Sequence, residues 1–283
     1  MRQFLTRLEL AAGLDRFGDR AQRVVQAVLR PQRVRDALHG VWLGHPLHPV
    51  LVQIPIGAWT SAAVIDLMPG QRRAATALVA FGTASALPAA ISGANDWAAS
   101  SREQRRVGLV HATTNIIATA LYTTSLAARL SGRHRAGRYL ALLGLGAVSG
   151  GAYLGGHLAY KQGVGVNQGA PELRRIPDGW HPVADLTALP QNTLLTRRVD
   201  NVSVVVYRDG DDVTVLLERC AHQGGPLGAG RVTRVDGQVC VVCPWHGSTF
   251  QLGDGEVVHG PAGTDQQILP TRVLGGVVET RLP

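Results

Sequence analysis

The sequence contains little cysteine, few aromatic residues and few acidic residues. Three of its 283 residues are cysteine, and 5% are Phe, Trp or Tyr. Three cysteines, two of them in metal-ligand spacing, exclude the disulfide framework of a small secreted protein. Only 20 Asp and Glu stand against 28 Lys and Arg, so the net charge is +8. This charge suits nucleic acid or an anionic membrane surface, and because the arginines flank apolar runs we expect a membrane and no nucleic acid.

The N-terminus also lacks the charged start, short apolar core and small-residue cleavage site of a secretory signal, so we expect residues 1–40 to be retained. Within them, the segment 20–29 places Val24, Val25, Val28 and Leu29 on one face of a helix, with arginines elsewhere. This pattern predicts either a helix lying at the membrane interface or an ordinary surface helix.

The rest of the chain has two halves of unlike composition. Residues 49–160 are rich in Ala, Leu, Val and Gly, whereas the chain after 176 shows short Val-rich alternating segments split by Asp/Gly turns. We therefore predict an α-helical membrane four-helix bundle followed by an all-β domain. The expected division is 1–40 for basic amphipathic helices, 41–160 for the four-helix domain, 161–175 for a flexible Gly-rich linker and 176–283 for the β domain.

Four apolar stretches in the first half, at 50–68, 74–94, 107–130 and 139–160, each approach the ~20 residues that span a hydrocarbon core. A buried soluble bundle is the alternative, but four such segments in series favour a multi-pass membrane domain. If all four cross, both chain ends share one side of the membrane. The flanking Arg and Lys slightly favour the cytoplasm for that side and for the C-terminal domain.

Two short motifs in the second half combine cysteine with histidine, Cys220-Ala-His222 and Cys243-Pro-Trp-His246. Two thiolates and two imidazoles are what a binuclear iron cluster needs when one iron takes two cysteines and the other takes two histidines. Tetrahedral zinc, which accepts the same set, is the alternative. The third cysteine, Cys240, is predicted to be a small buried hydrophobe and not a ligand.

The segments CAHQGGPLGAG and CPWHGSTFQLGDGEVVHGPA resemble the Rieske ferredoxin family over roughly residues 176–282. The resemblance implies a small antiparallel β-sandwich that carries a 2Fe-2S cluster and transfers single electrons. It implies that Cys220 and Cys243 bind one iron, that His222 and His246 bind the other, and that 260–262 form a third loop over the cluster.

Three departures from the family pattern indicate which kind of Rieske protein this chain resembles. The respiratory branch joins its two ligand loops by a disulfide, but those positions hold Gly225 and Trp245 here, so no such bond is expected. Ser248 stands where a hydroxyl bonds a bridging sulfur in the high-potential branch, whereas Phe250 replaces the partner tyrosine, which predicts an intermediate reduction potential. Since the sequence ends at Pro283, we expect no catalytic mononuclear iron domain, and thus an electron carrier and not an oxygenase.

The run Gly44-His45-Pro46-Leu47-His48-Pro49 resembles a family of small bacterial membrane proteins, domain of unknown function 2231, over about residues 38–165. This resemblance implies a membrane location. Sorting the helix ends by side places His45, His48, His111 and His157 together, on the side of the C-terminal domain. We predict a haem b or quinone site there, with another metal site or a purely structural role as alternatives. The other histidines, His39, His134, His181 and His259, are expected at the surface.

Three functional hypotheses follow. The first is a membrane-anchored Rieske iron-sulfur protein, the electron-transfer component of an oxidoreductase system, that exchanges single electrons between a redox protein and a membrane haem or quinone. The second is an iron-sulfur redox sensor that signals through the membrane helices. The third is a simple tethered ferredoxin with an inert anchor.

Overall fold

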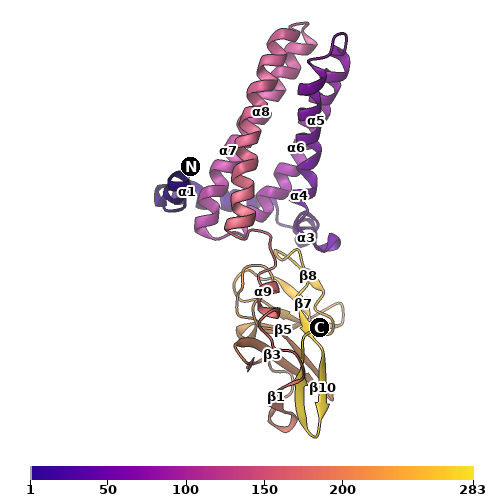
Figure 1. Cartoon of the computed structure of the whole chain (residues 1–283). Coiled ribbons are helices and arrows are strands. Elements are labelled where there is room, and N and C mark those ends of the chain that lie inside the picture. Colours follow the sequence, from indigo (N-terminus) through magenta and orange to yellow (C-terminus); the bar gives the residue numbers. More distant parts are fainter. Residues whose placement is uncertain (1) are drawn as a thin grey trace. The chain divides into compact units, whose positions relative to one another are not determined.

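The computed structural model describes residues 2–283, which form two compact units (Figure 1). The helical unit comprises residues 2–30 and Leu47–Val164, and the β unit comprises Pro31–Pro46 and Gly165–Pro283. A helical first half and an all-β second half confirm the predicted fold class.

The helical unit contains all four apolar stretches as helices. In chain order its elements are α1 (Arg2–Glu9), the 3-10 turn η1 (Ala12–Leu14), α2 (Asp15–Val28), α4 (His48–Leu51), α5 (Gln53–Ile65), α6 (Arg72–Ala98), α7 (Arg102–Leu130), α8 (His134–Gly156) and the π-helical turn η3 (His157–Lys161). The described residues before 157 hold eight helices and not only the four of the expected bundle. Three of the other four, α1, α2 and α3 (Gln32–His39), lie in the segment expected to form amphipathic helices, and α4 directly precedes α5. A capping box fixes the start of α7: the Ser101 hydroxyl accepts from the Gln104 N–H, and the Gln104 side chain accepts from the Ser101 N–H.

Glycines let neighbouring helices pack closely. A Cβ on each of three α8 glycines would lie within 2.8 Å of an α7 side chain, the pairs being Gly137 with Arg129, Gly144 with Tyr122 and Gly151 with Asn115. On α6, a Cβ at Gly82 or Gly93 would lie 2.7 Å from the ring of Trp59 or His48. Small residues of this kind allow close helix contact inside a membrane, where the hydrophobic effect does not drive helices together.

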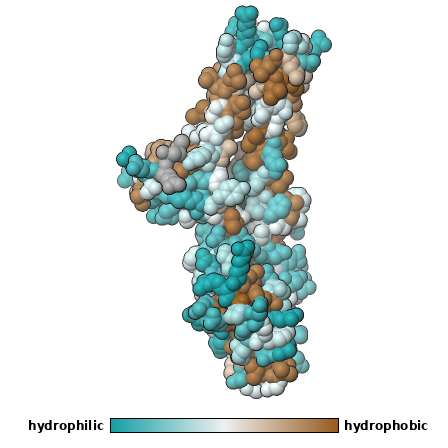
Figure 2. Space-filling model, viewed as in Figure 1, coloured by the Kyte–Doolittle hydropathy of each residue, from teal (hydrophilic) through white to brown (hydrophobic). Residues whose placement is uncertain are grey.

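Three helical stretches are long and apolar enough to cross a membrane by length and composition, namely His48–Ile65, Arg72–Ala98 and His134–Lys161. Large apolar side chains are exposed along the long helices (Figure 2), among them Phe81, Leu87, Ile116, Leu142 and Leu143. Such exposure costs free energy in water and is favourable in lipid.

The fourth expected span, α7, does not meet that composition criterion, because the part that follows its charged first turns contains His111, Asn115 and five threonines. Each of five threonine hydroxyls donates to the carbonyl four residues earlier, at Thr113, Thr114, Thr119, Thr123 and Thr124. Hydroxyls satisfied within the helix cost less in lipid than their hydropathy suggests. Crossing of the membrane by α7 therefore stays a prediction.

Ion pairs hold α2 against the start of α7. Arg106 Nε lies 2.7 Å from Asp15 Oδ1, and Arg105 Nη2 lies 2.9 Å from Asp19 Oδ1. The hydrogen bond from Arg106 lowers the pKa of Asp15. The other side of α2 exposes apolar side chains, including Phe17, Val24 and Val28, which either an interfacial or a surface helix could present.

The β unit consists of three antiparallel sheets. Its strands are β1 (His181–Asp185), β2 (Leu195–Val199), β3 (Val202–Asp209), β4 (Asp212–Leu217), β5 (Arg231–Val235), β6 (Gln238–Val242), β7 (Thr249–Gln251), β8 (Val257–His259), β9 (Ile268–Leu269), β10 (Thr271–Leu274) and β11 (Val277–Thr280). The sheet orders are β1-β11-β10, β2-β3-β4-β9 and β5-β6-β7-β8. Its short helical elements are α3 (Gln32–His39), η2 (Val41–Leu43), α9 (Ala170–Leu173), η4 (Leu186–Ala188) and η5 (Leu227–Ala229).

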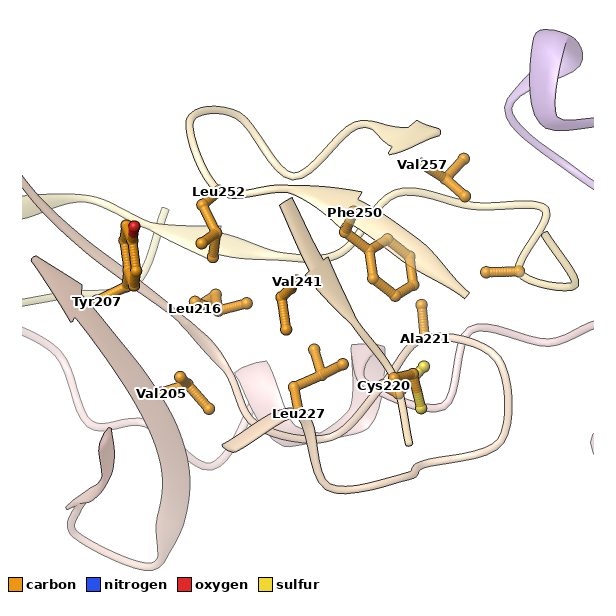
Figure 3. Close-up of a cluster of buried hydrophobic side chains, with 12 residues drawn as sticks. Val205, Tyr207, Leu216, Cys220, Ala221, Leu227, Val241, Phe250, Leu252 and Val257 are labelled. Carbon is orange, nitrogen blue, oxygen red and sulfur yellow. The ribbon is translucent and has the colours of Figure 1, made fainter. Parts of the chain in front are cut away.

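The core of the β unit lies beneath the loops that carry the cysteines. Figure 3 shows Val205, Leu216, Leu227, Val241 and Phe250 in one buried cluster, with Cys220 at its edge. Val205 and Leu216 come from β3 and β4, and Val241 and Phe250 come from β6 and β7, following the alternation that the Val-rich segments predicted. Leu227 comes from a short 3-10 turn at 227–229. The packed cluster gives the loops a rigid base.

Two segments group differently from the expected domain division. Residues Pro31–Pro46, expected in the N-terminal and membrane parts, belong to the β unit. Gly165 onward also belongs to it, where a flexible linker was expected, because Asn167 Oδ1 accepts from the Gly169 and Ala170 N–H groups at the start of α9 and the Gln168 N–H donates to the Ala221 carbonyl. The remaining expected boundaries stay predictions.

Candidate metal centre

Two loops of the β unit bring the cysteines and histidines of the sequence motifs together. One loop follows β4 and carries Cys220 and His222, and the other joins β6 to β7 and carries Cys243 and His246. The second loop is positioned by the hairpin of β5 and β6, whose turn residues Asp236 and Gly237 both have positive φ. An Asp-Gly pair is suited to such a two-residue turn. The turn therefore sets the register between β5 and β6, and with it the position of Cys243 at the end of β6.

The two loops have the same backbone design. In the first, the Cys220 N–H donates to Gly225 O and the Gly224 N–H donates to Cys220 O. In the second, the Cys243 N–H donates to Ser248 O and the Gly247 N–H donates to Cys243 O, so the offsets are the same. Gly224 and Gly247 have φ of 72° and 80°, the left-handed region that favours glycine. Both loops therefore present their side chains from equivalent turns.

The cysteines lie side by side, and the histidines form a second pair. The Cys220 and Cys243 thiols are hydrogen-bonded and buried. The hydrogen bond with Cys243, together with burial, raises the pKa of Cys220, and the same bond lowers the pKa of Cys243 to about 6. The ring centroids of His222 and His246 are 5.0 Å apart with planes at 89°. The same two loops thus carry a pair of thiols and a pair of imidazoles.

His222 is left with an unsatisfied ring nitrogen. Its Nδ1 is buried and has no hydrogen-bond partner in the described structure. Burial lowers the pKa of His222 to about 3, so the ring is neutral and Nδ1 can offer a lone pair to a metal. A Cβ at Gly225 would lie 2.8 Å from Cys243 Sγ, so the cysteine pair is closely covered. These observations fit residues that bind a metal cluster.

No group of three or more His, Cys, Asp or Glu side chains in the described part of the chain is arranged to hold a single metal ion. A binuclear cluster does not need one, because each of its irons takes two protein ligands. Mononuclear zinc with two cysteines and two histidines would need all four side chains at one point. One cysteine pair and one histidine pair are the donors that such a binuclear cluster takes.

Ser248 and Ala262 connect the second loop to the third. Ser248 is fully buried, and its Oγ accepts from the Ala262 N–H at 3.0 Å. Because that contact uses an oxygen lone pair, the hydroxyl proton stays available for another acceptor. Such a proton is what the predicted bond to a cluster sulfur requires.

Gln266 is a site residue that the sequence did not indicate. It is buried, its Nε2 donates to Leu217 O and Arg219 O, and its Oε1 accepts from the Ala221 N–H. These three bonds hold the first cysteine loop onto the core. A single glutamine outside any motif carries no sequence signal of this role.

The segment Pro31–Pro46 covers the third loop of the same unit. Asp36 in α3 accepts from the Gly260 N–H at 2.9 Å and lies 2.9 Å from His259 Nδ1. His39 is buried, and a Cβ at Gly260 would lie 2.7 Å from its ring. The expectation that His39 is a surface residue is wrong, because α3 brings it against the loop at 260–262.

The comparisons with known families agree with this geometry. Residues 179–271 match the family model described as "Rieske [2Fe-2S] domain". Residues 179–271 form a Rieske domain. The match contains both cysteine loops and the third loop, and the family implies a 2Fe-2S cluster and electron transfer.

Relatives of the Rieske domain include small electron carriers. The domain is 26% identical to the anthranilate 1,2-dioxygenase ferredoxin subunit of Burkholderia cepacia, over 36% of this chain and 92% of that protein. It is 37% identical to a human Rieske domain-containing protein, but the match covers 22% of this chain and only 40% of the human protein. Among solved structures, the ferredoxin of carbazole 1,9a-dioxygenase from Nocardioides aromaticivorans IC177 matches with 24% identity and a TM-score of 0.35, over 38% of this chain and all of that one.

Residues 44–168 match the family model described as "Predicted membrane protein (DUF2231)". Together with the three apolar helical stretches, this match indicates a predicted membrane domain in the same chain as the Rieske domain.

The four histidines predicted to share one site in this membrane domain are divided by the structure. His45 belongs to the β unit, is exposed, and has Nδ1 3.2 Å from the carbonyl of its neighbour Pro46. His157 has Nε2 2.8 Å from Glu9 Oε1. Only His48 and His111 face each other, with ring centroids 6.4 Å apart. The sequence sorted helix ends by side and could not tell which rings face one another.

Proposed function

We propose that the protein is a membrane-anchored electron-transfer component that passes single electrons between a redox protein and a haem or quinone in the membrane. The observation that carries the proposal is the pairing of two buried cysteines with two histidines on equivalent loops of a Rieske domain that is part of a membrane protein.

In this proposal Cys220 and Cys243 hold one iron and His222 and His246 hold the other. When bound, the cluster supplies a one-electron carrier, whose imidazole-bound iron gives it a higher potential than a cluster bound by four cysteines. The protein residues keep both thiols buried, hold the His222 ring neutral and orient the loops through paired backbone hydrogen bonds.

Electron exchange with a partner needs an accessible edge close to the cluster. His246 is exposed, and the next residue towards the N-terminus, Trp245, is 58% exposed although it is a large apolar side chain. Trp is enriched in protein interfaces, and a single exposed aromatic beside a ligand gives a partner a place to dock. We assign Trp245 and His246 to the docking edge for the redox partner.

In this proposal the redox group in the membrane is a haem or a quinone. The distribution of Arg and Lys slightly favours the cytoplasmic side for the Rieske domain. The membrane anchor keeps the carrier at the bilayer surface, which limits its search for a membrane-bound acceptor to two dimensions.

Electron paramagnetic resonance of the reduced, full-length protein tests the cluster assignment. The wild-type chain should give the rhombic signal of a 2Fe-2S cluster with mixed ligands, and His246→Cys should shift it towards that of a four-cysteine cluster. Cys240→Ala is the matched control, because Cys240 is buried in β6 and its thiol donates to the Gln238 carbonyl of the same strand. An unchanged signal in His246→Cys, or its loss in Cys240→Ala, would contradict the ligand assignment.

A further inference from the structure

The two membrane histidines that face each other come from different helix pairs. His48 lies at the start of α4, and its Nδ1 is 2.8 Å from the Ala89 carbonyl of α6. His111 lies in α7, and its Nδ1 is 2.8 Å from the Gly151 carbonyl of α8. A hydrogen bond to a neighbouring helix thus fixes the orientation of each ring.

These hydrogen bonds decide the tautomer of both rings. A carbonyl oxygen only accepts, so Nδ1 must carry the proton in each ring, and Nε2 of the neutral ring then carries a lone pair. A ring N–H donated to a backbone carbonyl is the usual second contact of a metal-bound histidine, because it fixes the ring and raises its basicity. Both Nε2 atoms are therefore prepared as ligands.

A neighbouring amide leaves the lone pair of His111 accessible. Asn115 Nδ2 lies 3.4 Å from Nδ1 and 3.3 Å from Nε2 of His111, and it donates to the His111 carbonyl at 2.9 Å. Since the two ring distances are nearly equal, the amide lies over the ring face and not in line with Nε2. It supports the orientation of the ring without using its ligand atom.

The separation of the rings points to one metal between them, on a straight line. A metal–nitrogen bond of about 2 Å and a ring radius of about 1 Å place each centroid about 3 Å from the metal. Two rings on opposite sides are then about 6 Å apart, whereas two rings at a tetrahedral angle are about 5 Å apart. The His48 and His111 centroids are 6.4 Å apart with planes at 82°, whereas the His222 and His246 pair, assigned to one tetrahedral iron, measures 5.0 Å.

An internal repeat of the membrane domain places the two histidines at equivalent positions. His48 and Trp59 correspond to His111 and Tyr122, 63 positions later in the chain. Trp59 and Tyr122 stack with centroids 4.1 Å apart and planes at 3°. The backbone acceptors Ala89 and Gly151 correspond in the same way with an offset of 62, as do the glycines that flank the rings, Gly93 and Gly155. The two repeats thus contribute equivalent histidines, His48 and His111, that face each other.

We propose that His48 and His111 bind a haem iron through their Nε2 atoms, as its two axial ligands on opposite faces. A haem keeps four in-plane positions for its own nitrogens and leaves two opposite positions for the protein. A bare tetrahedral ion would need two further ligands and a narrower angle. The inference deepens the proposed function by naming its membrane redox group, and it excludes His45 and His157 from the site.

The test is haem binding by the full-length protein in detergent, before and after addition of hemin. The wild-type chain should carry about one haem per chain, with a Soret band that sharpens on reduction and a low-spin ferric resonance. His48→Ala and His111→Ala should each reduce the bound haem about tenfold, and the matched control His45→Ala should not change it. In His111→Gly, added imidazole should restore the low-spin spectrum, which separates a lost ligand from a misfolded domain.

Other results would overturn either the haem site or the proposed function. Full haem content in both His48→Ala and His111→Ala would overturn the ligand pair. A wild-type chain that takes up no hemin, or that holds zinc at these histidines, would overturn the haem site. If such a chain still shows the Rieske resonance, the proposed electron-transfer function survives without a haem. Absence of the Rieske resonance would overturn the proposed function. The Soret band would then still show whether the haem site exists.

Discussion

At the scale of single residues, Ser248 is the side chain predicted to tune the reduction potential of the proposed cluster. Its buried Oγ accepts from the Ala262 N–H, so its proton is directed to another acceptor. Hydrogen bonds to cluster sulfur stabilise the reduced, more negative state. Ser248→Ala should lower the reduction potential by on the order of tens of millivolts, as measured by voltammetry. Ser248→Thr keeps the hydroxyl and should retain most of the potential, whereas an unchanged potential in the alanine variant would refute the role.

The second prediction at this scale is that replacement of Gln266 lowers the free energy of unfolding of the Rieske domain. Gln266→Leu keeps a similar volume but leaves one buried N–H and two buried carbonyls without this partner. Unsatisfied buried groups cost about 1–3 kcal/mol each, so with partial relaxation we expect a loss of about 3 kcal/mol in the free energy of unfolding. Denaturation followed by the visible absorption of the cluster measures it. Gln267→Leu is the control, since Gln267 Nε2 only donates to the adjacent Ile268 carbonyl, and equal losses in both variants would contradict the assignment.

At the scale of elements, α3 is an addition to the Rieske domain from a distant part of the chain. Asp36 joins α3 to the third loop through the Gly260 N–H and His259. Asp36→Ala should free this loop, so that the Gly260 amide exchanges with deuterium about tenfold faster and iron is released sooner. Asp211→Ala, at an exposed turn position, is the matched control. Unchanged exchange at Gly260 would show that α3 does not hold the loop.

The attachment of α2 depends on pH. The Arg106 hydrogen bond lowers the pKa of Asp15, so the carboxylate binds its proton less readily when α2 is docked than when it is released. The resulting stabilisation is complete above the ordinary value of 3.8 and is lost as the pH falls through the lower, docked value. Deuterium exchange of α2 amides, corrected for the intrinsic rate, should therefore rise in that acidic range. In Asp15→Asn this step should be absent, and an identical pH profile in the variant would disprove the linkage.

The sequence predicted the parts of the structure that depend on local patterns, but not the contacts between distant segments. Local patterns were sufficient for the cysteine loops, because Cys-X-His and Cys-X-X-His followed by glycine describe a turn within a few residues. Apolar runs likewise predicted all four long helices. The positions of Asp36, His39 and Gln266 depend on contacts between segments far apart in the chain. No periodicity or spacing encodes such contacts.

At the scale of the whole molecule, the number of membrane crossings decides where the Rieske domain lies. Four crossings place the loop at 67–71 and the loop at 131–133 on one side and the Rieske domain on the other. If α7 does not cross, the loop at 67–71 and the Rieske domain share a side, and the loop at 131–133 lies opposite. The satisfied threonines of α7 favour four crossings.

Single cysteines introduced at exposed positions can distinguish these arrangements. In inside-out and right-side-out vesicles, Gln71→Cys and Ser131→Cys should react with an impermeant maleimide from one side, and Asp211→Cys from the other. The native Cys220, Cys240 and Cys243 are buried, so the unsubstituted chain gives the background. We expect Asp211→Cys to be labelled from the cytoplasmic face, as the arginine distribution predicts. Labelling of Gln71→Cys and Asp211→Cys from the same side would exclude α7 as a span, because those two positions share a side only when an even number of crossings, α6 and α8, separates them.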